Sequence, residues 1–201
     1  MNPPPMSEFV LPPLSLAGWT VRLLGDADAP LLQAFFDANP DYFQRSDGHA
    51  AGPEEAIETL RDAPPPELSW SSKGVFGFFA PDDRLGAMAQ VIGGLMVESV
   101  WHIGLFILAT ERHGRGEAQS LVRWLEDLAL SRQAHWMRLG VLVKNPRAAR
   151  FWEKTGYRCV RLRQDVQVGE QRHDVRVMVK PLRGGELAAY LELVARDRPE
   201  G

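Results

Sequence analysis

Two glycines stand at the junction between an apolar segment and a polar one with helical periodicity. Gly114 and Gly116 follow the apolar run "VWHIGLFIL" (100–108) and precede apolar positions spaced as on one face of a helix. A turn at a helix start presents unpaired backbone N–H groups, and the helix dipole adds about half a positive charge there. Neither glycine has a side chain that would block an anion. Because Arg112 and Arg115 can add charge-assisted hydrogen bonds, the turn predicts a phosphate or pyrophosphate site.

The spacing of the turn separates it from two common nucleotide-binding motifs. A P-loop requires Gly-Lys-Ser/Thr after a longer loop, and the chain has no such triplet. A dinucleotide fingerprint requires a third glycine where Gln119 stands, and an acid where the following strand ends in Lys144-Asn145. A glycine turn that holds no ligand stays open as an alternative at this point.

A second motif lies about thirty residues further along the chain. Asn145 and Pro146 precede a short amphipathic pattern that stops at Gly156, which predicts a helix with an asparagine N-cap and a glycine terminator. Together, "HGRGEA" (113–118) and "NPRAARFWEKTGY" (145–157) resemble the GNAT superfamily of acetyl-CoA-dependent N-acetyltransferases. The first follows the family pattern Gln/Arg-x-x-Gly-x-Gly/Ala except at its first residue. The second follows Asn-x-x-Ala, an aromatic pair and Glu-Lys-x-Gly-Phe/Tyr.

The resemblance implies a cofactor site built on these two segments. In the family the glycine turn holds the pyrophosphate of coenzyme A, and the pantetheine arm lies between two splayed central strands. The backbones of Phe106 and Leu108 are the expected contacts to pantetheine and to the thioester carbonyl. Asn145 either touches the amide arm of the cofactor or serves only as the helix cap. The residues that the resemblance assigns to acetyl-CoA are Phe106, Ile107, Leu108, His113, Gly114, Arg115, Gly116, Glu117, Ala118, Asn145, Ala148, Phe151 and Trp152.

Two of these positions depart from the family pattern. His113 stands where the family has Gln or Arg, which predicts a weaker contact rather than lost binding, because backbone N–H groups make most of the contacts. Trp152 stands where many members have a tyrosine that protonates the departing thiolate. An indole cannot supply that proton. We therefore expect Trp152 to be a wall of the cofactor tunnel, and the acid to be absent, replaced by water or drawn from elsewhere.

The candidate base is His102, because direct attack of a neutral amine on a thioester needs a group that accepts the amine's proton. His102 lies eleven residues before His113, an offset at which histone-modifying relatives carry a glutamate base. Alternation along a strand places its side chain on the same face as Phe106, toward the acetyl group. A pKa of about 6.5 suits proton transfer near neutral pH. A core histidine satisfied by a backbone carbonyl is the alternative, and Glu98 and Glu111 are weaker candidates.

The acceptor side carries fewer signals. Tyr42 and Phe43, an aromatic pair after the first expected helix, either line the acceptor site or belong to the core. The arginines of "YRCVRLR" (157–163) are expected to face solvent along a strand edge. We expect the acceptor to be the primary amine of a small molecule, an amino acid or a peptide.

These groups need a scaffold, and the remaining pattern predicts one. The expected order is a strand, two short helices, a hairpin, then strand, helix, strand, helix and two alternating strands, which matches the GNAT layout. It predicts an α/β fold: a single GNAT-like domain with a mixed central sheet of about six to seven strands and flanking helices. We expect a proline-rich lead-in at 1–17, the N-acetyltransferase domain at 18–183, and a C-terminal helix and tail at 184–201.

Composition narrows the remaining classes. With 201 residues, 45% of them hydrophobic, and a net charge of −3, the chain suits one soluble domain, and the lack of a basic run predicts no nucleic-acid partner. No apolar run reaches the ~20 residues of a membrane helix, and no signal peptide is apparent, so we expect a cytoplasmic protein without membrane contact. The histidines show no metal-ligand spacing, so no metal is expected. A homodimer would be common for the family.

The leading expectation is therefore an acetyltransferase that uses acetyl-CoA as donor. The alternative, which Trp152 motivates, is an acyl-CoA-binding or sensory GNAT domain with little or no catalysis.

Overall fold

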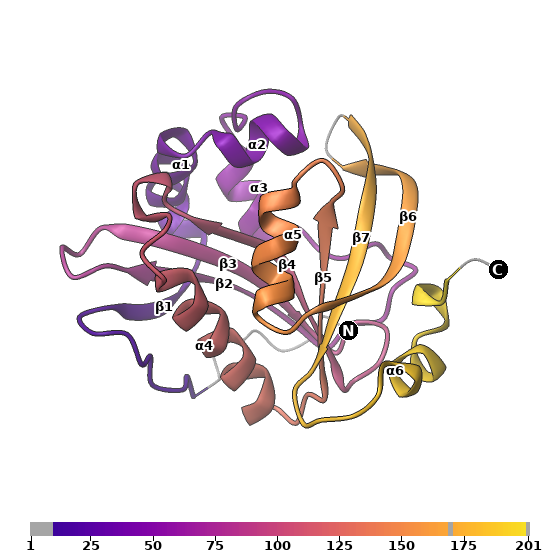
Figure 1. Cartoon of the computed structure of the whole chain (residues 1–201). Helices are drawn as coiled ribbons and strands as arrows, with labels where there is room; N and C mark the ends of the chain where they lie inside the picture. The colour runs from indigo at the N-terminus through magenta and orange to yellow at the C-terminus, as the bar shows by residue number, and fades with distance from the viewer. Residues whose placement is uncertain (1–9, 169–170, 200–201) are drawn as a thin grey trace.

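One seven-stranded mixed sheet organises the molecule (Figure 1). The computed structural model describes residues 10–168 and 171–199. The strands lie in the order β1-β2-β3-β4-β5-β7-β6, and all neighbours are antiparallel except the parallel pair β4 and β5. They are β1 (Thr20–Leu24), β2 (Ser72–Phe79), β3 (Leu85–Gly93), β4 (Val100–Leu108), β5 (Trp136–Leu142), β6 (Arg158–Val168) and β7 (Gln171–Pro181). The predicted α/β fold with a mixed sheet of six to seven strands is confirmed.

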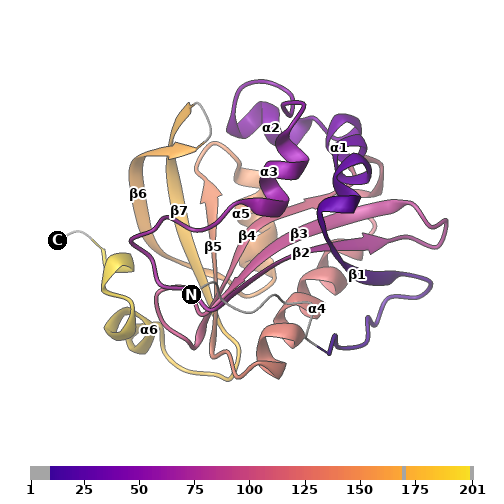
Figure 2. The ribbon, with the colours of Figure 1, turned by 180° about the vertical axis from the view of Figure 1, so that it is seen from behind.

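Helices cover both faces of this sheet. Helices α4 and α5 lie in front of it in Figure 1, whereas α1, α2 and α3 lie on the opposite face, which Figure 2 turns toward the viewer. The helices are α1 (Ala29–Ala38), α2 (Asp41–Ser46), α3 (Glu55–Arg61), α4 (Glu117–Ser131), α5 (Pro146–Lys154) and α6 (Leu187–Leu193), with the 3-10 turns η2 (Asp26–Asp28), η3 (Thr110–Arg112) and η4 (Ala195–Asp197). Helix α2 is a third helix before the hairpin, where the sequence pattern predicts two. A proline is tolerated at a helix start, and here Pro40 is the N-cap of α2.

Each face has its own hydrophobic core. Under α4 and α5, Trp124 is fully buried and packs edge-on against Phe76 and Phe78, with ring centroids 5.2 Å and 5.3 Å away. Under α1 to α3, Phe36 and Phe43 form a similar edge-on pair at 4.8 Å. Burying side chains of this size contributes on the order of 2 kcal/mol each, so both helix layers are firmly attached to the sheet.

The proline-rich lead-in is only partly described. Its first nine residues lie outside the described part of the chain. From residue 10 to 15 there is no helix or strand, yet Leu11 and Leu14 pack against the core under α4. The indole nitrogen of Trp124 also donates a 2.8 Å hydrogen bond to the carbonyl of Pro12. This described part of the lead-in is therefore packed against the domain.

The C-terminal segment closes one end of the sheet. The predicted last helix is present as α6 and continues into η4 (Figure 1). Tyr190 of α6 is fully buried and packs on Trp136 of β5 at 5.5 Å between ring centroids. Among the helices of the described residues, none has both the length and the apolar character needed to cross a membrane.

Candidate functional site

The two parallel strands β4 and β5 separate at one end, and this gap is the centre of the site. They pair over only four positions, from Val100 opposite Trp136 to Ile103 opposite Leu139. Beyond Ile103 the strands diverge, so the backbone of β4 from Gly104 onward faces no neighbouring strand on that side. The gap opens a path through the sheet.

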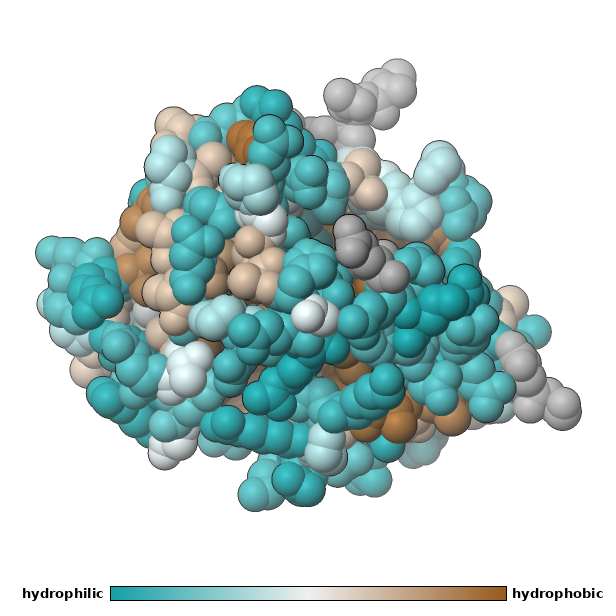
Figure 3. Space-filling view, turned by 90° about the horizontal axis from the view of Figure 1, so that it is seen from above, coloured by the Kyte–Doolittle hydropathy of each residue, from teal (hydrophilic) through white to brown (hydrophobic). Residues whose placement is uncertain are grey.

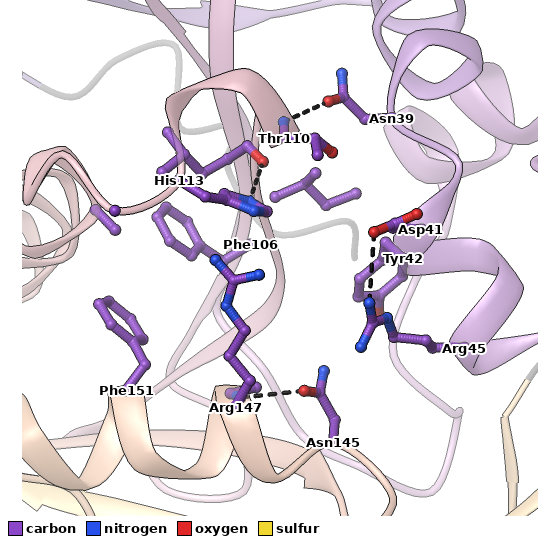
Figure 4. Close-up of a pocket in the computed structure, with 15 residues that line it drawn as sticks. Asn39, Asp41, Tyr42, Arg45, Phe106, Thr110, His113, Asn145, Arg147 and Phe151 are labelled. Atoms are coloured by element: carbon purple, nitrogen blue, oxygen red, sulfur yellow. Dashed lines mark hydrogen bonds and ion pairs between the residues drawn. The ribbon is translucent and has the colours of Figure 1, made fainter.

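Two cavities meet at this gap. The first, of about 250 Å³, lies beside the glycine turn and is called here the loop cavity (Figure 4). The second, of about 320 Å³, lies along β4, β5, β6 and β7 and is called the strand cavity. Both are lined by Tyr42, Arg45, Phe106, Asn145 and Ala148, so they are two ends of one groove. Seen from above, the surface is mainly hydrophilic and encloses a paler, more apolar area (Figure 3).

The glycine turn has the geometry of an anion cradle. Gly114 and Gly116 have φ angles of 83° and 80°, in the left-handed region that other residues rarely adopt, and Gly116 is the N-cap of α4. A Cβ on either glycine would meet open space, so the turn is accessible to a ligand. In the described part of the chain, none of the backbone N–H groups from Gly114 to Ala118 donates a hydrogen bond. These free donors and the helix dipole favour a pyrophosphate.

Two side chains fix the turn from opposite directions. The Oδ1 of Asn39, at the end of α1, accepts a 2.7 Å hydrogen bond from the backbone N–H of Thr110, and its Nδ2 donates to the carbonyl of Phe35. The Nε2 of His113 lies 3.0 Å from the carbonyl oxygen of Leu108 and therefore donates to it. His113 thus braces the end of β4, a role that its position in the motif did not predict. Figure 4 shows both contacts.

The arginines of the turn do not point into the loop cavity. Arg112 lies 5.0 Å over the ring of Trp19 and forms an ion pair of 3.4 Å with Glu117, whereas Arg115 donates to the carbonyl of Glu111. The side chains of Arg112, Arg115 and Glu117 line a separate outer depression. Both arginine side chains therefore lie on the outer side of the turn, held there by the carboxylate of Glu117 and the backbone carbonyl of Glu111, and their contact with an anion stays a prediction.

The cations that do line the loop cavity come from other elements. Arg147, in the first turn of α5, is exposed and extends toward the centre of the cavity, and Arg45 of α2 lies across from it (Figure 4). Neither was singled out in the sequence, because α2 was not expected and Arg147 is an ordinary helix-surface residue by pattern.

The backbone of β4 faces the gap at the two predicted residues. The N–H of Ala109 bonds to the carbonyl of Gly86 on β3 at 2.8 Å. Because hydrogen-bonding direction alternates along an antiparallel strand, the N–H and C=O groups of Leu108 and Phe106 point the other way, into the gap. These are groups with which an extended amide chain can pair.

Helix α5 forms the opposite wall. The Oδ1 of Asn145 accepts a 3.1 Å hydrogen bond from the N–H of Ala148, so the predicted N-cap is confirmed. Its Nδ2 has no hydrogen-bond partner in the described part of the chain, and the residue lines both cavities, so capping does not prevent a ligand contact. Trp152 is 7% exposed, packs against Phe106 and Phe151, and lines the strand cavity, as a wall residue would.

Ten of the thirteen residues assigned to the cofactor line one or both cavities. They are Phe106, Ile107, Leu108, His113, Gly114, Ala118, Asn145, Ala148, Phe151 and Trp152. The remaining three, Arg115, Gly116 and Glu117, contribute backbone N–H groups to the turn, as described above.

The predicted orientation of His102 is wrong because β4 contains a bulge. Gln90 of β3 lies opposite Leu105 and the next residue lies opposite Ile103, so Gly104 is an extra residue without a partner. A Cβ at Gly104 would lie 2.6 Å from the Oε1 of Gln90, so the side chain of Gln90 would have to move to admit it. Past the bulge, Ile103 shares the α4/α5 face with Phe106, and His102 points to the other face.

The surroundings of His102 also weaken it as a base. It lines the strand cavity, and its Nδ1 accepts a 3.3 Å hydrogen bond from Nη1 of Arg138. Burial, and then the positive charge of Arg138, lower the pKa of His102 to about 3. The imidazole is therefore neutral at pH 7, and its nitrogen that could accept a proton is already hydrogen-bonded.

Arg138 belongs to a buried network that the sequence did not predict. Its Nε and Nη2 donate to the two carboxylate oxygens of Asp197 in η4, at 2.7 Å and 3.0 Å, and Tyr190 donates to the same carboxylate at 2.6 Å. Asp197 is 0% exposed. Burial acts to raise the pKa of Asp197, but the hydrogen bonds and charge of Arg138 outweigh it and hold the pKa below its usual value. The C-terminal segment thus contacts the strand cavity through Arg138.

Strand β6 contributes a further cation to the strand cavity, next to a bulge. Arg163 lies opposite Val175 and Val166 lies opposite His173, so two residues of β6 face one of β7 between these pairs. Both Arg163 and Val166 consequently line the cavity. The expectation that the arginines of this segment face solvent is wrong for Arg163, since a bulge cannot be read from alternation.

The aromatic pair of α2 divides between the two expected roles. Tyr42 is partly buried and lines both cavities, as an acceptor-site residue would. Phe43 is 2% exposed, lies against Phe36 in the core and lines neither cavity. The prediction of a substrate contact for Phe43 is therefore corrected: successive residues of a helix point about 100° apart, and only Tyr42 faces the groove.

Comparisons with known proteins agree with this geometry. Residues 32–157 match the model of a family described as "Acetyltransferase (GNAT) family". No curated protein matches the chain. Among solved structures, a spermidine N-acetyltransferase from Vibrio cholerae in complex with CoA and spermine has a TM-score of 0.64 at 18% identity, covering 83% of this chain and 97% of that one.

Two further solved structures show the same fold. An acetyltransferase from Thermus thermophilus has a TM-score of 0.63 at 19% identity and covers 81% of this chain and 96% of that one. The ribosomal-protein-S18-alanine N-acetyltransferase from Escherichia coli has a TM-score of 0.58 at 15% identity, covering 84% and 96%.

Proposed function

Because this chain belongs to the GNAT family of acetyltransferases, we propose that it transfers the acetyl group of acetyl-CoA to a primary amine of a small molecule, an amino acid or a peptide. The observation that carries the proposal is the gap between β4 and β5 with the free N–H groups of the glycine turn at its mouth. The similar fold of the Vibrio cholerae enzyme, whose structure contains CoA and spermine, supports it.

The proposal gives each wall of the groove a task. The N–H groups of residues 114 to 118 hold the pyrophosphate, and Arg147 adds positive charge on the other side of the loop cavity. The backbone of Phe106 and Leu108 pairs with the pantetheine arm, and the free amide nitrogen of Asn145 contacts it from α5. No metal takes part in this scheme.

The chemistry is direct attack. The lone pair of a neutral amine forms a bond to the thioester carbon, the C–S bond breaks, the amine nitrogen releases one proton and the thiolate takes one up. Among the described residues that line the strand cavity there is no Asp or Glu, and His102 is too weakly basic. We therefore propose that the amine enters in its neutral form and that its proton leaves to water.

Tyr42 is the tyrosine best placed to donate a hydrogen bond during acetyl transfer. The other two tyrosines, Tyr157 and Tyr190, are fully buried, whereas Tyr42 lines both cavities. Burial, and then the charges of Asp47 and Glu55, raise the pKa of Tyr42 above its usual value. Its hydroxyl therefore keeps its proton at neutral pH and acts as a hydrogen-bond donor in the groove.

The decisive experiment combines calorimetric titration with CoA and thiol release from acetyl-CoA over a panel of primary amines. Saturable CoA binding together with thiol release on at least one amine is expected. Absence of CoA binding would contradict the proposal. Tight CoA binding without turnover on any amine would favour the alternative, a binding or sensory domain. That alternative is considered because Trp152 stands where many family members have a tyrosine.

Three finer statements belong to the same proposal. We propose a cytoplasmic enzyme, a homodimer, and a catalytic domain at 18–183 between the lead-in (1–17) and the C-terminal segment (184–201). The contact of Asp197 with Arg138 supports counting the C-terminal segment as part of the folded unit. Light scattering in solution checks the dimer.

A further inference from the structure

The strand cavity carries an unusual balance of charge. Three arginines line it, Arg45 from α2, Arg138 from β5 and Arg163 from β6, together with His102. Within the described residues no carboxylate lines the same cavity. An enzyme that acts on a cation would be expected to present the opposite balance.

The three arginines differ in how far their charge is already neutralised. Arg138 is paired with the fully buried Asp197 through two hydrogen bonds. Arg45 is 3.4 Å from Asp41, with both side chains about half exposed, a pair that screening makes weak. Arg163 forms no ion pair within 4 Å in the described part of the chain, although the charge of the buried Asp197 acts on it, and its hydrogen bond to the carbonyl of Arg196 is long at 3.5 Å.

The position of Arg163 is unfavourable for a cation unless an anion joins it. Its side chain is partly buried, and burial, followed by the positive charges of Arg196 and Arg138, lowers its pKa. A guanidinium that remains charged in such a place gains most from a planar anion that it can bind through two hydrogen bonds. Arg163 lies opposite Val175 of β7, which lines the same cavity, and the bulge that follows places Val166 on that side as well.

The rest of the wall is apolar. Val166, Val168, Val175 and Val177 line the cavity from β6 and β7, close in sequence to Arg163. A site in which Arg163 stands beside aliphatic side chains suits a small molecule that has a carboxylate and an apolar body. Its amine then has the gap between β4 and β5 to face.

We propose that the acceptor is an amine that carries a carboxylate, such as an apolar α-amino acid, and that Arg163 binds this carboxylate. The inference rests on the proposed acetyltransferase function and narrows its substrate class. It separates this chain from the enzyme whose structure holds spermine, since a polyamine would place its cations against Arg163 and Arg45.

The test compares matched acceptors on matched variants. Thiol release is measured for an apolar amino acid such as leucine, for its uncharged amide, and for spermidine, with the wild type, Arg163→Gln, Arg163→Lys and Arg158→Gln. Arg158 is an exposed arginine of the same strand that lines neither cavity, so its variant controls for lost surface charge. Thermal unfolding of each variant checks that it is folded.

The expected pattern is specific to a carboxylate contact. Arg163→Gln should lower kcat/KM for the amino acid about 10- to 100-fold, as loss of a charged hydrogen bond does, and leave the amide within about twofold. Arg163→Lys should lie between, and Arg158→Gln should match the wild type. For each acceptor, kcat/KM of the variant is divided by that of the wild type, and the two quotients are then compared. The lower basicity of the amide's amine affects both proteins equally and therefore cancels.

The outcomes separate the two proposals. Equal losses for acid and amide would assign Arg163 a structural role at the C-terminal contact and overturn the inference. Preference of the wild type for spermidine would overturn it too. If CoA binds but no amine turns over, stabilisation of the CoA complex by leucine and not by its amide supports the carboxylate site, and no stabilisation overturns it. Absence of CoA binding removes the proposed function itself.

Discussion

The two ends of the groove are built from different parts of the chain. At the loop cavity the ligand-facing groups are mostly backbone: the N–H groups of residues 114 to 118 and the gap-facing edge of β4. At the strand cavity they are side chains, with His102, Arg138 and Arg163 brought together from three strands. The first end depends on the local conformation of one turn, the second on long-range packing.

The difference shows in how each end is stabilised. The glycine turn is held by one local contact, His113 donating to Leu108 five residues before it, and by one distant contact, Thr110 donating to Asn39. The strand cavity depends on Arg138, whose partner Asp197 is 59 residues away in the C-terminal segment. A change at one end should therefore leave the other end largely unaffected, and this separation can be tested.

The largest effect is expected from Asp197→Asn. The change leaves the buried guanidinium of Arg138 without its counter-charge, and breaking a buried ion pair from one side typically costs about 3–5 kcal/mol. The free energy of unfolding, measured by chemical denaturation, should fall by about 3 kcal/mol, since the amide keeps some hydrogen bonding.

A matched control for this variant is Glu67→Gln. Glu67 pairs with Arg196 at 3.8 Å, but both side chains are substantially exposed, so the loss should be below about 1 kcal/mol. Under conditions where Asp197→Asn is still folded, its CoA affinity should stay near that of the wild type. A parallel loss of CoA affinity would show that the two ends are coupled.

The reverse pattern is expected from Gly116→Asp. Gly116 has a φ of 80°, and a carboxylate there adds backbone strain and a negative charge beside the expected pyrophosphate. CoA affinity, measured by calorimetry, should fall at least about 100-fold, or about 2.7 kcal/mol. Gly52→Asp is the control, because a Cβ at Gly52 also meets open space but its φ is not positive. Unchanged CoA binding in Gly116→Asp would remove the turn from the cofactor site.

A smaller effect concerns the pH dependence of the strand cavity. The native pKa of His102 is about 3, below its unfolded value of about 6.5. Between these values the unfolded chain binds a proton that the native state does not, so stability falls as pH decreases through that range. Protonation of His102 in the unfolded chain accounts for part of this loss of stability.

The variant His102→Asn isolates that part, because an asparagine oxygen can still accept from Arg138 but cannot titrate. Between pH 7 and 5 the wild type should lose about 1–2 kcal/mol more than His102→Asn. Identical acid sensitivity of the two proteins would show that His102 is not held neutral. Turnover of the variant near that of the wild type at pH 7 would agree with a non-catalytic imidazole.

The same contrast explains what the sequence could predict. The turn at Gly114 and Gly116 and the cap at Asn145 are local motifs, in which residue type follows directly from φ or from a capping hydrogen bond, so their positions and the fold around them could be predicted. The strand cavity could not be predicted in the same way. The bulge at Gly104 reversed the face of His102, and the bulge between Arg163 and Val166 placed both of these residues on the cavity side of β6.

Asp197 shows a second reason. In sequence it is an acid in a charged tail, and only its burial under β5 and its contact with Arg138 make it structural. Alternation and helical periodicity describe one element at a time, whereas this contact joins two segments that no local pattern relates. Predictions from the sequence were therefore most accurate where backbone conformation makes the site.

The smallest expected effect is at the junction of the two ends, where Tyr42 lines both cavities. Tyr42→Phe removes one hydroxyl and keeps the ring that packs on Phe43 at 5.2 Å. Because the raised pKa keeps this hydroxyl protonated, it can donate a hydrogen bond but cannot act as a base. Loss of one neutral hydrogen bond, about 0.5–1 kcal/mol, should lower kcat about two- to fivefold with little change in CoA affinity.

Phe43→Leu, a change in the adjacent core residue, should instead lower stability with kcat nearly unchanged. A loss of kcat beyond about 100-fold in Tyr42→Phe would mean that the phenol transfers the proton to the thiolate, and the chemistry at the junction would then depend on a side chain as strictly as the strand cavity does.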